Sequence, residues 1–581
     1  RMGCQTLMLA INPDTIGQMS CNPAIGGLAK GHLAREIDAL GGEMGRNTDL
    51  TGLQFRMLNT KKGPSVWAPR AQCDKKAYQF RLKWICERQA NLDCKQGQTA
   101  RLLHREGAVV GVETTLEVQY LSRTVVITTG TFLRGLMHVG SNQQAGGRAG
   151  EAAAMGLSGS LKELGLELGR LKTGTPPRLV RGSIDFAKTE VQPGDEPVPW
   201  FTYFPEELFK EGDGRSETVE GVFHVEQGRS SDSGARPYPP GSILAQAGGQ
   251  LPCYITWTTD RTAEIIRANL HKSPMYSGVI EGVGPRYCPS IEDKIVKFPE
   301  KERQQIFLEP EGIATDEIYV NGFSTCLPFE VQYEMVRSII GCERAEIMRP
   351  AYAVEYDFAF PTQLHPSLET KVCANLYLAG QINGTTGYEE AGAQGLVAGL
   401  NAAKLAGGQD PITIDRTEAY IGVMIDDLVT QGVTEPYRMF TSRSEYRLSL
   451  RSDNADERLT DKAVAFGLVK GLRQKKYAER HHHLERARAL LKSLQLSPSE
   501  AVQKGLKVNQ DGIRRSAFDL LSYPDQTLAN LARIWPELGD VPANLVDRLE
   551  NDARYAVYLD RQQRDIAVYR RDESLFIPSD L

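Results

Sequence analysis

The chain of 581 residues lacks the patterns of several common protein classes. Its ten cysteines include no C-x-x-C pair, which argues against a zinc ribbon and against a thioredoxin-like redox motif. No run approaches about 18 consecutive apolar residues, so the sequence predicts no membrane-spanning helix. The net charge is −5, so binding of nucleic acid would need a local basic face. Scattered thiols in a large chain indicate a reducing compartment.

The start of the chain also lacks a G-x-G-x-x-G phosphate-binding loop. Residues 4–11 form an apolar run after Gly3, which predicts a buried strand that follows a glycine helix cap. This is the second half of a nucleotide-binding βαβ unit, in which the glycine loop would come first. We therefore expect the sequence to be a fragment. Asp14 is the one acidic residue here that could bind a ribose, and it lies slightly late.

Residues 375–402 are the most informative stretch of the chain. Residues 375–379 predict a short buried strand that ends at Gly380, and a small-residue helix is predicted from about Tyr388. A strand, a glycine turn and such a helix are typical of a cofactor site, because a helix start offers free N–H groups and a positive dipole end. Flavoproteins of the glutathione-reductase type hold the flavin with a similar element. A helix that merely packs closely on a sheet gives the same pattern.

Cys21 is a candidate nucleophile. It lies in a proline- and glycine-rich loop, ahead of an amphipathic helical pattern that runs to Leu40. A thiol near a helix N-terminus is more readily ionised, and the thiolate is the reactive form. The alternative is an ordinary buried cysteine.

Cys288 has a similar setting in residues 281–294. Ser290 and Asp293 resemble a helix start, so Cys288 precedes a helix and has Arg286 two residues away. Both features lower the pKa of a thiol. Two cysteines in the same kind of setting strengthen the catalytic interpretation of each.

Residues 435–447 interleave three arginines, Arg438, Arg443 and Arg447, with three aromatic residues. This composition suits phosphate contact and base stacking, although a seam of salt bridges between domains has the same composition. Three consecutive histidines at 481–483 point in different directions on a helix, so we predict no metal site there. Residues 192–250 are rich in Pro, Gly, Ser and acidic residues and predict long surface loops.

Seven motifs resemble the MnmG (GidA) family nearly from end to end of the chain. They are M-S-C-N-P-A-I-G-G at 19–27, K-G-P at 62–64, G-G-R-A-G at 146–150, R-L-K-T-G-T-P-P-R at 170–178, E-G-V-G-P-R-Y-C-P-S-I-E-D-K at 281–294, A-G-Q-I-N-G-T-T-G-Y-E-E-A at 379–391 and E-P-Y-R-M-F-T-S-R at 435–443. Trp67 stands where many members of the family have arginine.

The resemblance implies an α/β fold: a glutathione-reductase-like FAD-binding Rossmann domain, an inserted α/β NADH-binding domain and a C-terminal all-α domain. The expected parts are an FAD-binding part at 1–190, the insertion at 191–345, a second FAD-binding part at 346–408 and a helical domain at 409–581. The last part would bind tRNA and the partner, and it lacks the small helical unit with which family members end.

The resemblance also implies modification of the wobble uridine of tRNA at C5, with FAD, NADH, methylenetetrahydrofolate and glycine or ammonium. The expected partners are tRNA and the GTPase MnmE, in a heterotetramer built on a homodimer, in the cytoplasm or in the mitochondrion of a eukaryote. Uracil C5 becomes nucleophilic when a thiolate adds at C6, and the family's two candidate catalytic cysteines match Cys21 and Cys288. Which of the two attacks C6 is left open.

The remaining site residues are implied by the resemblance or by the arginine-rich composition described above. The expected FAD contacts are Thr99, Ala154, Gly380, Gln381, Asn383, Gly384 and Thr385; the expected NADH contacts are Gly284, Pro285, Arg286, Tyr287 and Ser290; and the expected nucleic-acid contacts are Arg438, Arg443 and Arg447.

Three other functions fit parts of the sequence. A folate- and flavin-dependent tRNA uridine-5-methyltransferase uses related chemistry and would differ in the position that it modifies. A tRNA-binding scaffold without catalysis would tolerate Cys21→Ser and Cys288→Ser. A small-molecule NADH oxidoreductase would turn over without tRNA.

Overall fold

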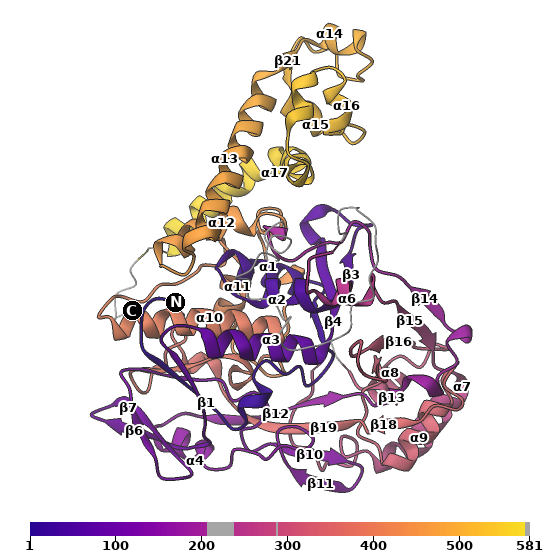
Figure 1. Cartoon of the computed structure of the whole chain (residues 1–581), viewed down its shortest axis with the longest axis vertical. Coiled ribbons are helices and arrows are strands. Elements are labelled where there is room, and N and C mark those ends of the chain that lie inside the picture. The colour runs from indigo at the N-terminus through magenta and orange to yellow at the C-terminus, as the bar shows by residue number, and fades with distance from the viewer. Residues whose placement is uncertain (206–237, 286–288, 574, 576–581) are drawn as a thin grey trace.

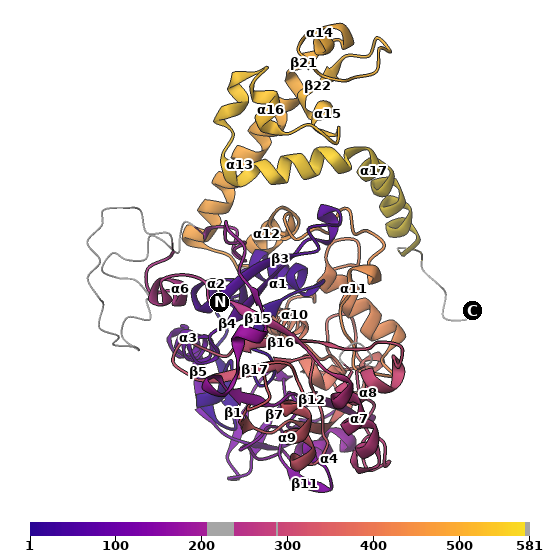
Figure 2. The same cartoon turned by 90° about the vertical axis from the view of Figure 1, so that its right-hand side faces the viewer.

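The structure is a computed structural model that describes residues 1–205, 238–285, 289–573 and 575. A broad body carries the sheets, and a helical arm projects from one side of it (Figure 1). Turned by 90°, the same molecule shows the long last helix lying across the top of the body (Figure 2). Among the described residues, no helix is both long and apolar enough to cross a membrane.

Two pairs of parallel strands lie in the part of the body that the sequence predicts to bind a nucleotide. Strand β1 (Thr6–Ala10) pairs with β5 (Leu92–Gln96), and β20 (Leu376–Leu378) pairs with β9 (Val125–Ile127). Helix α10 (Tyr388–Ala406) follows β20 and packs on α1 (Lys30–Ala39). The buried strand and the helix predicted for residues 375–402 are thus confirmed, because β20 is buried throughout.

The prediction of a buried first strand was wrong. Thr6 is exposed and the rest of β1 is half-buried, and residues 1–3 form no helix. Within the described chain β1 is hydrogen-bonded to β5 alone, so its other edge has no strand to cover it. Local hydrophobicity predicted the strand but could not supply the neighbours that would bury it.

Smaller elements surround the parallel pairs. They are α2 (Met44–Thr51), α3 (Lys75–Arg88), α4 (Leu157–Glu163) and α6 (Ile243–Ala247), the antiparallel meander β6 (Thr99–Arg105), β7 (Ala108–Thr114) and β8 (Gln119–Leu121), and the sheet β2 (Ala24–Gly26), β4 (Ala68–Cys73) and β3 (Gly52–Leu58). A four-stranded antiparallel sheet has the order β11 (Asn142–Ala145), β10 (Leu136–Val139), β19 (Tyr352–Ala359) and β12 (Leu168–Thr175).

A six-stranded antiparallel sheet contains the strands of the expected insertion, together with β13 (Arg178–Val180) and β18 (Ile347–Arg349) from its flanks. Its order is β14 (Glu190–Gln192), β15 (Cys253–Trp257), β16 (Gln305–Pro310), β17 (Glu317–Asn321), β13 and β18. Helices α7 (Asp260–Asn269), α8 (Ile291–Lys297) and α9 (Phe329–Arg337) share a buried apolar core with this sheet. Ser290 caps α8 by accepting from the Asp293 N–H, as the sequence predicts.

Part of the region predicted as surface loops is buried. Phe201 is completely buried, and its N–H donates to Asp49 Oδ1 at 2.7 Å. The Arg35 guanidinium donates to the carbonyls of residues 200–202 and lies 3.9 Å from the ring centroid of Tyr203. This stretch has no regular strand, so its burial depends on polar side chains that satisfy its backbone. The loop prediction for residues 206–237 lies outside the described residues.

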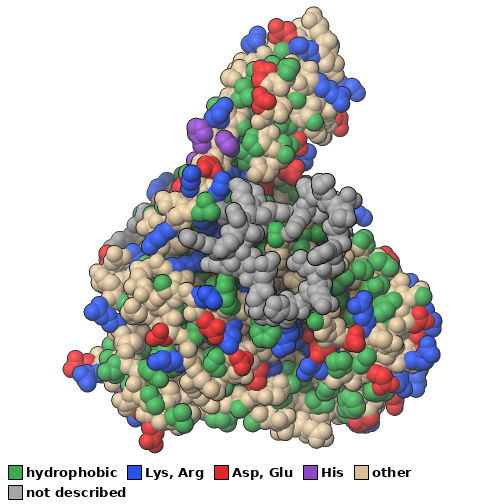
Figure 3. Space-filling view, in the orientation of Figure 1, with side chains coloured by type: hydrophobic (Ala, Val, Ile, Leu, Met, Phe, Trp, Pro, Cys, Tyr) green, Lys and Arg blue, Asp and Glu red, His purple; other side chains and the backbone are tan. Residues whose placement is uncertain are grey.

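The C-terminal part is mainly helical. It comprises α11 (Tyr420–Asp426), α12 (Ala455–Ala465), α13 (Gly471–Ser493), α14 (Pro498–Gln503), α15 (Ala517–Leu521), α16 (Leu528–Ala532) and α17 (Ala543–Glu573), with one small pair of strands, β21 (Gln495–Leu496) and β22 (Arg515–Ser516). The histidines on α13 lie where the arm meets the body, and acidic and basic side chains are interspersed over the visible face (Figure 3).

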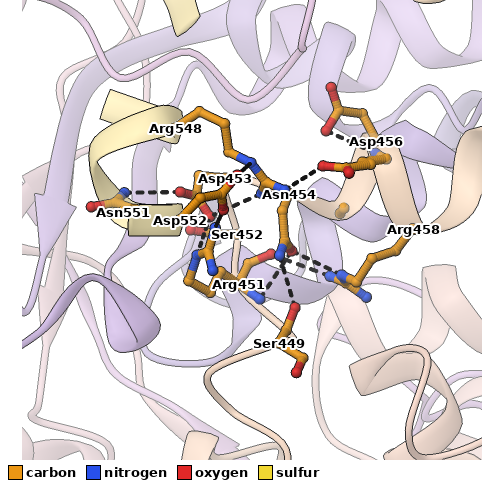
Figure 4. Close-up of polar contacts among 12 residues, drawn as sticks. Ser449, Arg451, Ser452, Asp453, Asn454, Asp456, Arg458, Arg548, Asn551 and Asp552 are labelled. Atoms are coloured by element: carbon orange, nitrogen blue, oxygen red, sulfur yellow. Dashed lines mark hydrogen bonds and ion pairs between the residues drawn. The ribbon is translucent and has the colours of Figure 1, made fainter. Parts of the chain in front are cut away.

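An ionic cluster, here called the joint, connects α17 to the body (Figure 4). Asp552 on α17 accepts from Arg451 Nη2 at 2.5 Å, from Arg488 Nη2 at 2.5 Å and from Arg548 Nε at 3.1 Å. Asp453 pairs with Arg451 at 2.8 Å and accepts from Asn551. The joint therefore fixes the arm by charge pairs that are largely removed from water.

Candidate functional site

Cys21 lies where three elements of the body meet. Its Sγ is 2.9 Å from the hydroxyl of Tyr319 on β17, and its backbone N–H donates to the hydroxyl of Tyr388 at 2.8 Å. Tyr388 is the first residue of α10, so this hydrogen bond ties the cysteine loop to the helix that follows the glycine turn. The thiol itself is half-buried. The sequence did not predict the short strand β2, which lies between Cys21 and α1 in the chain.

Arg178 places a positive charge beside this thiol. Its Nη2 donates to the Ser20 carbonyl at 3.1 Å, and its guanidinium lies 4.9 Å from the ring centroid of Tyr319. Glu311 fixes the guanidinium by an ion pair of 2.9 Å. The ion pair with buried Glu311 raises the pKa of Arg178, against the effect of burial, so the guanidinium stays charged.

A buried carboxylate organises the other side of the cysteine loop. Glu309 accepts from Asn22 Nδ2 at 2.7 Å and from Asn321 Nδ2 at 3.3 Å, and it forms an ion pair of 2.7 Å with Arg70. Arg70 is thus already paired with a carboxylate beneath the surface. The Cys21 loop is therefore fixed twice: its backbone binds Tyr388, and its Asn22 side chain binds Glu309.

The start of α10 is not a free anion site. Its first turn carries Glu389 and Glu390, both buried, and Lys30 Nζ lies 3.0 Å and 3.3 Å from their carboxylates. The Gly26 N–H also donates to Glu389 at 2.6 Å. The carboxylates raise the pKa of Lys30 despite its burial. The helix dipole therefore already faces two carboxylates of the chain itself, which the sequence interpretation did not foresee.

The expected FAD contacts gather at the carboxyl ends of the parallel strands. Thr99 is the first residue of β6. It lies two residues after Gly97, whose N–H donates to the Ala10 carbonyl at the end of β1. Ala154 is buried and forms a parallel bridge with Leu133, beyond the end of β9. Ligands of α/β sheets bind at this edge, so the two residues lie where a dinucleotide would bind.

Gly380, Gln381, Asn383, Gly384 and Thr385 form the turn after β20. Gly380 has a φ of 86° and Gly384 a φ of 78°, values that L residues rarely adopt. Gln394 Oε1 on α10 accepts from the Gly380 N–H at 3.1 Å and from Asn383 Nδ2 at 2.8 Å, and Gln394 Nε2 donates to Thr385 Oγ1 at 3.0 Å. The turn is thus held rigidly against the helix.

Two polar atoms at this edge fit a bound cofactor. Asn383 Oδ1 and Thr129 Oγ1 are buried and have no hydrogen-bond partner among the described residues. Thr129 precedes Gly130 at the end of β9, and a Cβ at Gly130 would lie 3.7 Å from Gln381 Oε1. Such atoms are few in folded proteins, and a polar ligand that displaced the atoms covering them would satisfy both. With that displacement, the donors and acceptors of this turn fit the polar edge of a flavin.

The expected NADH contacts lie in a different place, against β12. Val283 forms a parallel bridge with Leu171, and Glu355 accepts from the Glu281 and Gly282 N–H groups at 2.9 Å and 2.7 Å. Gly284, Pro285 and Ser290 follow. Pro285 and Ser290 line a cavity of about 10 Å³ with Lys172, Gly174, Met275, Ser324, Thr325, Cys326 and Ala353. A cavity of this size holds about one water molecule, so a nucleotide would require movement. Arg286, Tyr287 and Cys288 lie outside the described residues.

The three arginines expected to contact nucleic acid differ in their surroundings. Arg443 is half-buried, pairs with Asp427 at 3.4 Å and lies 4.2 Å from the ring centroid of Tyr437. Arg438 lies 5.8 Å from the ring centroid of Phe440, whereas Arg447 is exposed. Both interpretations of this segment thus have a counterpart: a salt-bridged seam at Arg443 and an accessible cation at Arg447.

Sequence analysis missed the residues that surround Cys21. Tyr319, Arg178 and Tyr388 come from three separate elements, and only Arg178 and Tyr388 lie within motifs that the sequence analysis quoted. Tyr319 is one aromatic residue in an ordinary strand, and no local signal distinguishes it.

The fold and the site together define an α/β protein of the FAD-binding class, with a thiol close to the helix that follows the cofactor turn. The family described as "Glucose inhibited division protein A" matches residues 1–220 and 226–410, and the "tRNA modifying enzyme MnmG/GidA C-terminal helical domain" matches residues 472–563. The chain belongs to the GidA family.

Individual relatives agree. The "tRNA uridine 5-carboxymethylaminomethyl modification enzyme MnmG" of Geotalea uraniireducens is 51% identical, over 100% of this chain and 88% of its own length. The protein with the same name in Geobacter sulfurreducens is also 51% identical, over 100% of this chain and 87% of its own. A solved structure of Aquifex aeolicus GidA has 46% identity and a TM-score of 0.86, and the match covers 100% of this chain and 87% of that one. The predicted family and fold class are thereby confirmed.

Proposed function

We propose that this protein modifies tRNA at C5 of the wobble uridine, adding a carboxymethylaminomethyl or aminomethyl group. The observation that carries the proposal is the position of Cys21: its sulfur faces Tyr319 and its backbone is tied to α10, the helix that closes the expected flavin turn. A nucleophile beside a flavin site is what the activation of a uracil ring requires.

The nucleophile acts on C6 of the base. A thiolate, of Cys21 or of Cys288, adds to C6 and moves the electron pair of the C5–C6 bond toward the C4 carbonyl, which makes C5 nucleophilic. C5 then forms a bond to a methylene electrophile, loses its proton to a base, and the thiolate leaves C6 with the ring restored. The second cysteine would serve in acid–base support of these steps. The base is reached from the anticodon loop, where it is unpaired and costs little to extrude.

The cofactors and partners follow from the same proposal. Bound FAD would be held by Gly380, Gln381, Asn383, Gly384 and Thr385 with Thr99 and Ala154, and it would supply hydride transfer and one-carbon chemistry. NADH is the reductant, methylenetetrahydrofolate gives the methylene group, and glycine or ammonium gives the amine. The exposed Arg447 contacts tRNA phosphate, and the protein works as a homodimer with the GTPase MnmE.

Nucleoside mass spectrometry tests the proposal. Cells that lack their own enzyme would carry this chain, extended to the full length of its relatives, as wild type, Cys21→Ser, Cys288→Ser or Cys94→Ser. Cys94 is a matched control because it is half-buried on β5, and within the described chain no ion pair or hydrogen bond joins it to the Cys21 loop. Wild type and Cys94→Ser should restore the modified wobble uridine, and at least one of the other variants should not.

Three outcomes would contradict the proposal. Restoration by both cysteine variants would favour a scaffold without catalysis. Appearance of 5-methyluridine at another position would favour a uridine-5-methyltransferase. NADH oxidation without tRNA, with no modified nucleoside from soluble, flavin-loaded protein, would favour a small-molecule oxidoreductase.

A further inference from the structure

The surroundings of Cys21 go beyond a thiol near a helix. Tyr319 is 3% exposed and lies in the interior of the six-stranded sheet, where β17 is paired with β13 on one side and with β16 on the other. Its direct partners in register are Arg178 and Glu309. A backbone held by two ladders gives the Tyr319 side chain little freedom, so its hydroxyl is fixed at the sulfur.

Charge strengthens the hydrogen bond that this hydroxyl can donate. The Arg178 guanidinium over the Tyr319 ring draws electron density toward the ring, which makes the O–H group more polar and a stronger hydrogen-bond donor. Arg178 is itself immobile, because it donates to Thr175 Oγ1 at 2.5 Å and to the Pro176 carbonyl at 3.0 Å in addition to its ion pair with Glu311. A donor polarised in this way binds an anionic sulfur more strongly than a neutral one.

We propose that Tyr319 is a positioning residue for Cys21: its hydroxyl donates a hydrogen bond to the sulfur and stabilises the thiolate, which is the nucleophilic form of this residue. The inference rests on the proposed function only in assuming that the thiolate attacks the uracil ring. The hydrogen bond itself does not require tRNA.

The other groups around the thiol do not compete in the useful pH range. Those that face it are Tyr319 on β17, Arg178 on β13, Tyr352 on β19 and Tyr388 on α10. Burial raises the pKa of Tyr352 and of Tyr388, so both are neutral from pH 6 to 9, while Arg178 stays charged. These three groups therefore keep the same charge state throughout that range.

The test measures the rate of alkylation of Cys21 by iodoacetamide between pH 6 and 9, with peptide mass spectrometry to separate it from the other cysteines. Tyr319→Phe keeps the ring and removes the hydroxyl. A hydrogen bond to a charged group is worth enough to shift the midpoint upward by about one pH unit. Because a more basic thiolate is also a better nucleophile, the rate constant below both midpoints should fall by about threefold.

Tyr352→Phe is the matched control. Tyr352 also lies near Cys21, but its hydroxyl accepts from the Ala149 N–H at 3.3 Å. Its removal should leave the profile of Cys21 in place. If Tyr319→Phe does not fold, 3-fluorotyrosine at position 319 retains the ring and a more acidic hydroxyl, and it should raise the rate constant at pH 7.

The inference is overturned if the profiles of wild type and Tyr319→Phe coincide, or if Cys21 does not react in the wild type while other thiols do. Nucleoside analysis of the same variants separates the two proposals. If Tyr319→Phe shifts the alkylation profile but the wild type does not modify tRNA, the inference stands and the proposed function fails. If the two alkylation profiles coincide and the wild type modifies tRNA fully, the proposed function stands and the inference fails.

Discussion

The joint between arm and body predicts that neutralising one carboxylate will free the arm. Asp552 has a side chain that is only 10% exposed, and it accepts hydrogen bonds from Arg451 in the body, Arg488 on α13 and Arg548 on α17 itself. Asp552→Asn removes the charge and leaves those cations partly uncompensated, although Asp453 and Glu457 remain nearby. Breaking a buried charge pair costs about 3 kcal/mol. We expect the opening free energy of α17 to fall by that amount.

Hydrogen exchange measured by mass spectrometry reports this opening directly. Residues 549–553 of α17 are mostly buried, and about 3 kcal/mol corresponds to a loss of roughly 100-fold in the protection of their amides. The control is Glu485→Gln, because Glu485 also pairs with Arg488, at 2.7 Å, but is 54% exposed. An exposed pair contributes about 0.5 kcal/mol, so the control should change protection by about twofold.

Acid should loosen the same joint. The arginines lower the pKa of Asp453 and of Glu457 to about 2 against the effect of burial, from ordinary values of 3.8 and 4.5. Their stabilisation is complete above the unfolded values and is lost as the pH falls from about 4 through about 2. Equal protection in Asp552→Asn and Glu485→Gln, or protection of α17 that is unchanged at pH 2, would refute the assignment of the joint to buried charge.

Two further perturbations test the body. Gly380→Ala places a Cβ 3.2 Å from that of Ala391 at a φ of 86°, so we expect a loss of about 1–2 kcal/mol and a lower flavin content, measured by absorbance. Gly408→Ala is the control: its φ is 70° and its Cβ would lie in open space, so it should carry similar strain without the flavin loss. Equal flavin contents in the two variants would contradict the assignment of the turn at Gly380 to flavin binding. Burial lowers the pKa of His32 from 6.5 to about 4, so wild-type stability should fall by up to about 3 kcal/mol as the pH drops from 6.5 to 4. His32→Gln should flatten that decline in denaturant titrations, and an identical pH slope would exclude His32 as its source.

Local patterns predicted the elements that hold the cofactor turn. The apolar run before Gly380 and the helical spacing after it indicated β20 and α10, because strand length, glycine turns and helix periodicity are properties of neighbouring residues. The same reasoning placed Cys21 in a loop ahead of α1 and Ser290 at the start of α8. The family resemblance added the chemistry that these elements could serve.

Local patterns failed where an outcome depended on distant neighbours. The half-buried state of β1 follows from the lack of a second strand beside it among the described residues. For Arg443 the sequence left open a nucleic-acid contact or a seam of salt bridges, and its pairing with Asp427 is a contact that composition could not assign. Composition shows that a charge is present but cannot show which partner it meets.

The sequence by itself determined the family, the glycine turn after β20 and the identity of the candidate thiols, because each depends on short motifs. Only the tertiary structure decided what surrounds Cys21: Tyr319 lies 298 positions away in the chain, and Tyr388 lies 367 positions away. The reactivity of a thiol is set by charges and donors within a few ångströms. Those distances are created by the packing of the inserted sheet and α10 around the loop, which short-range spacing in the sequence does not encode.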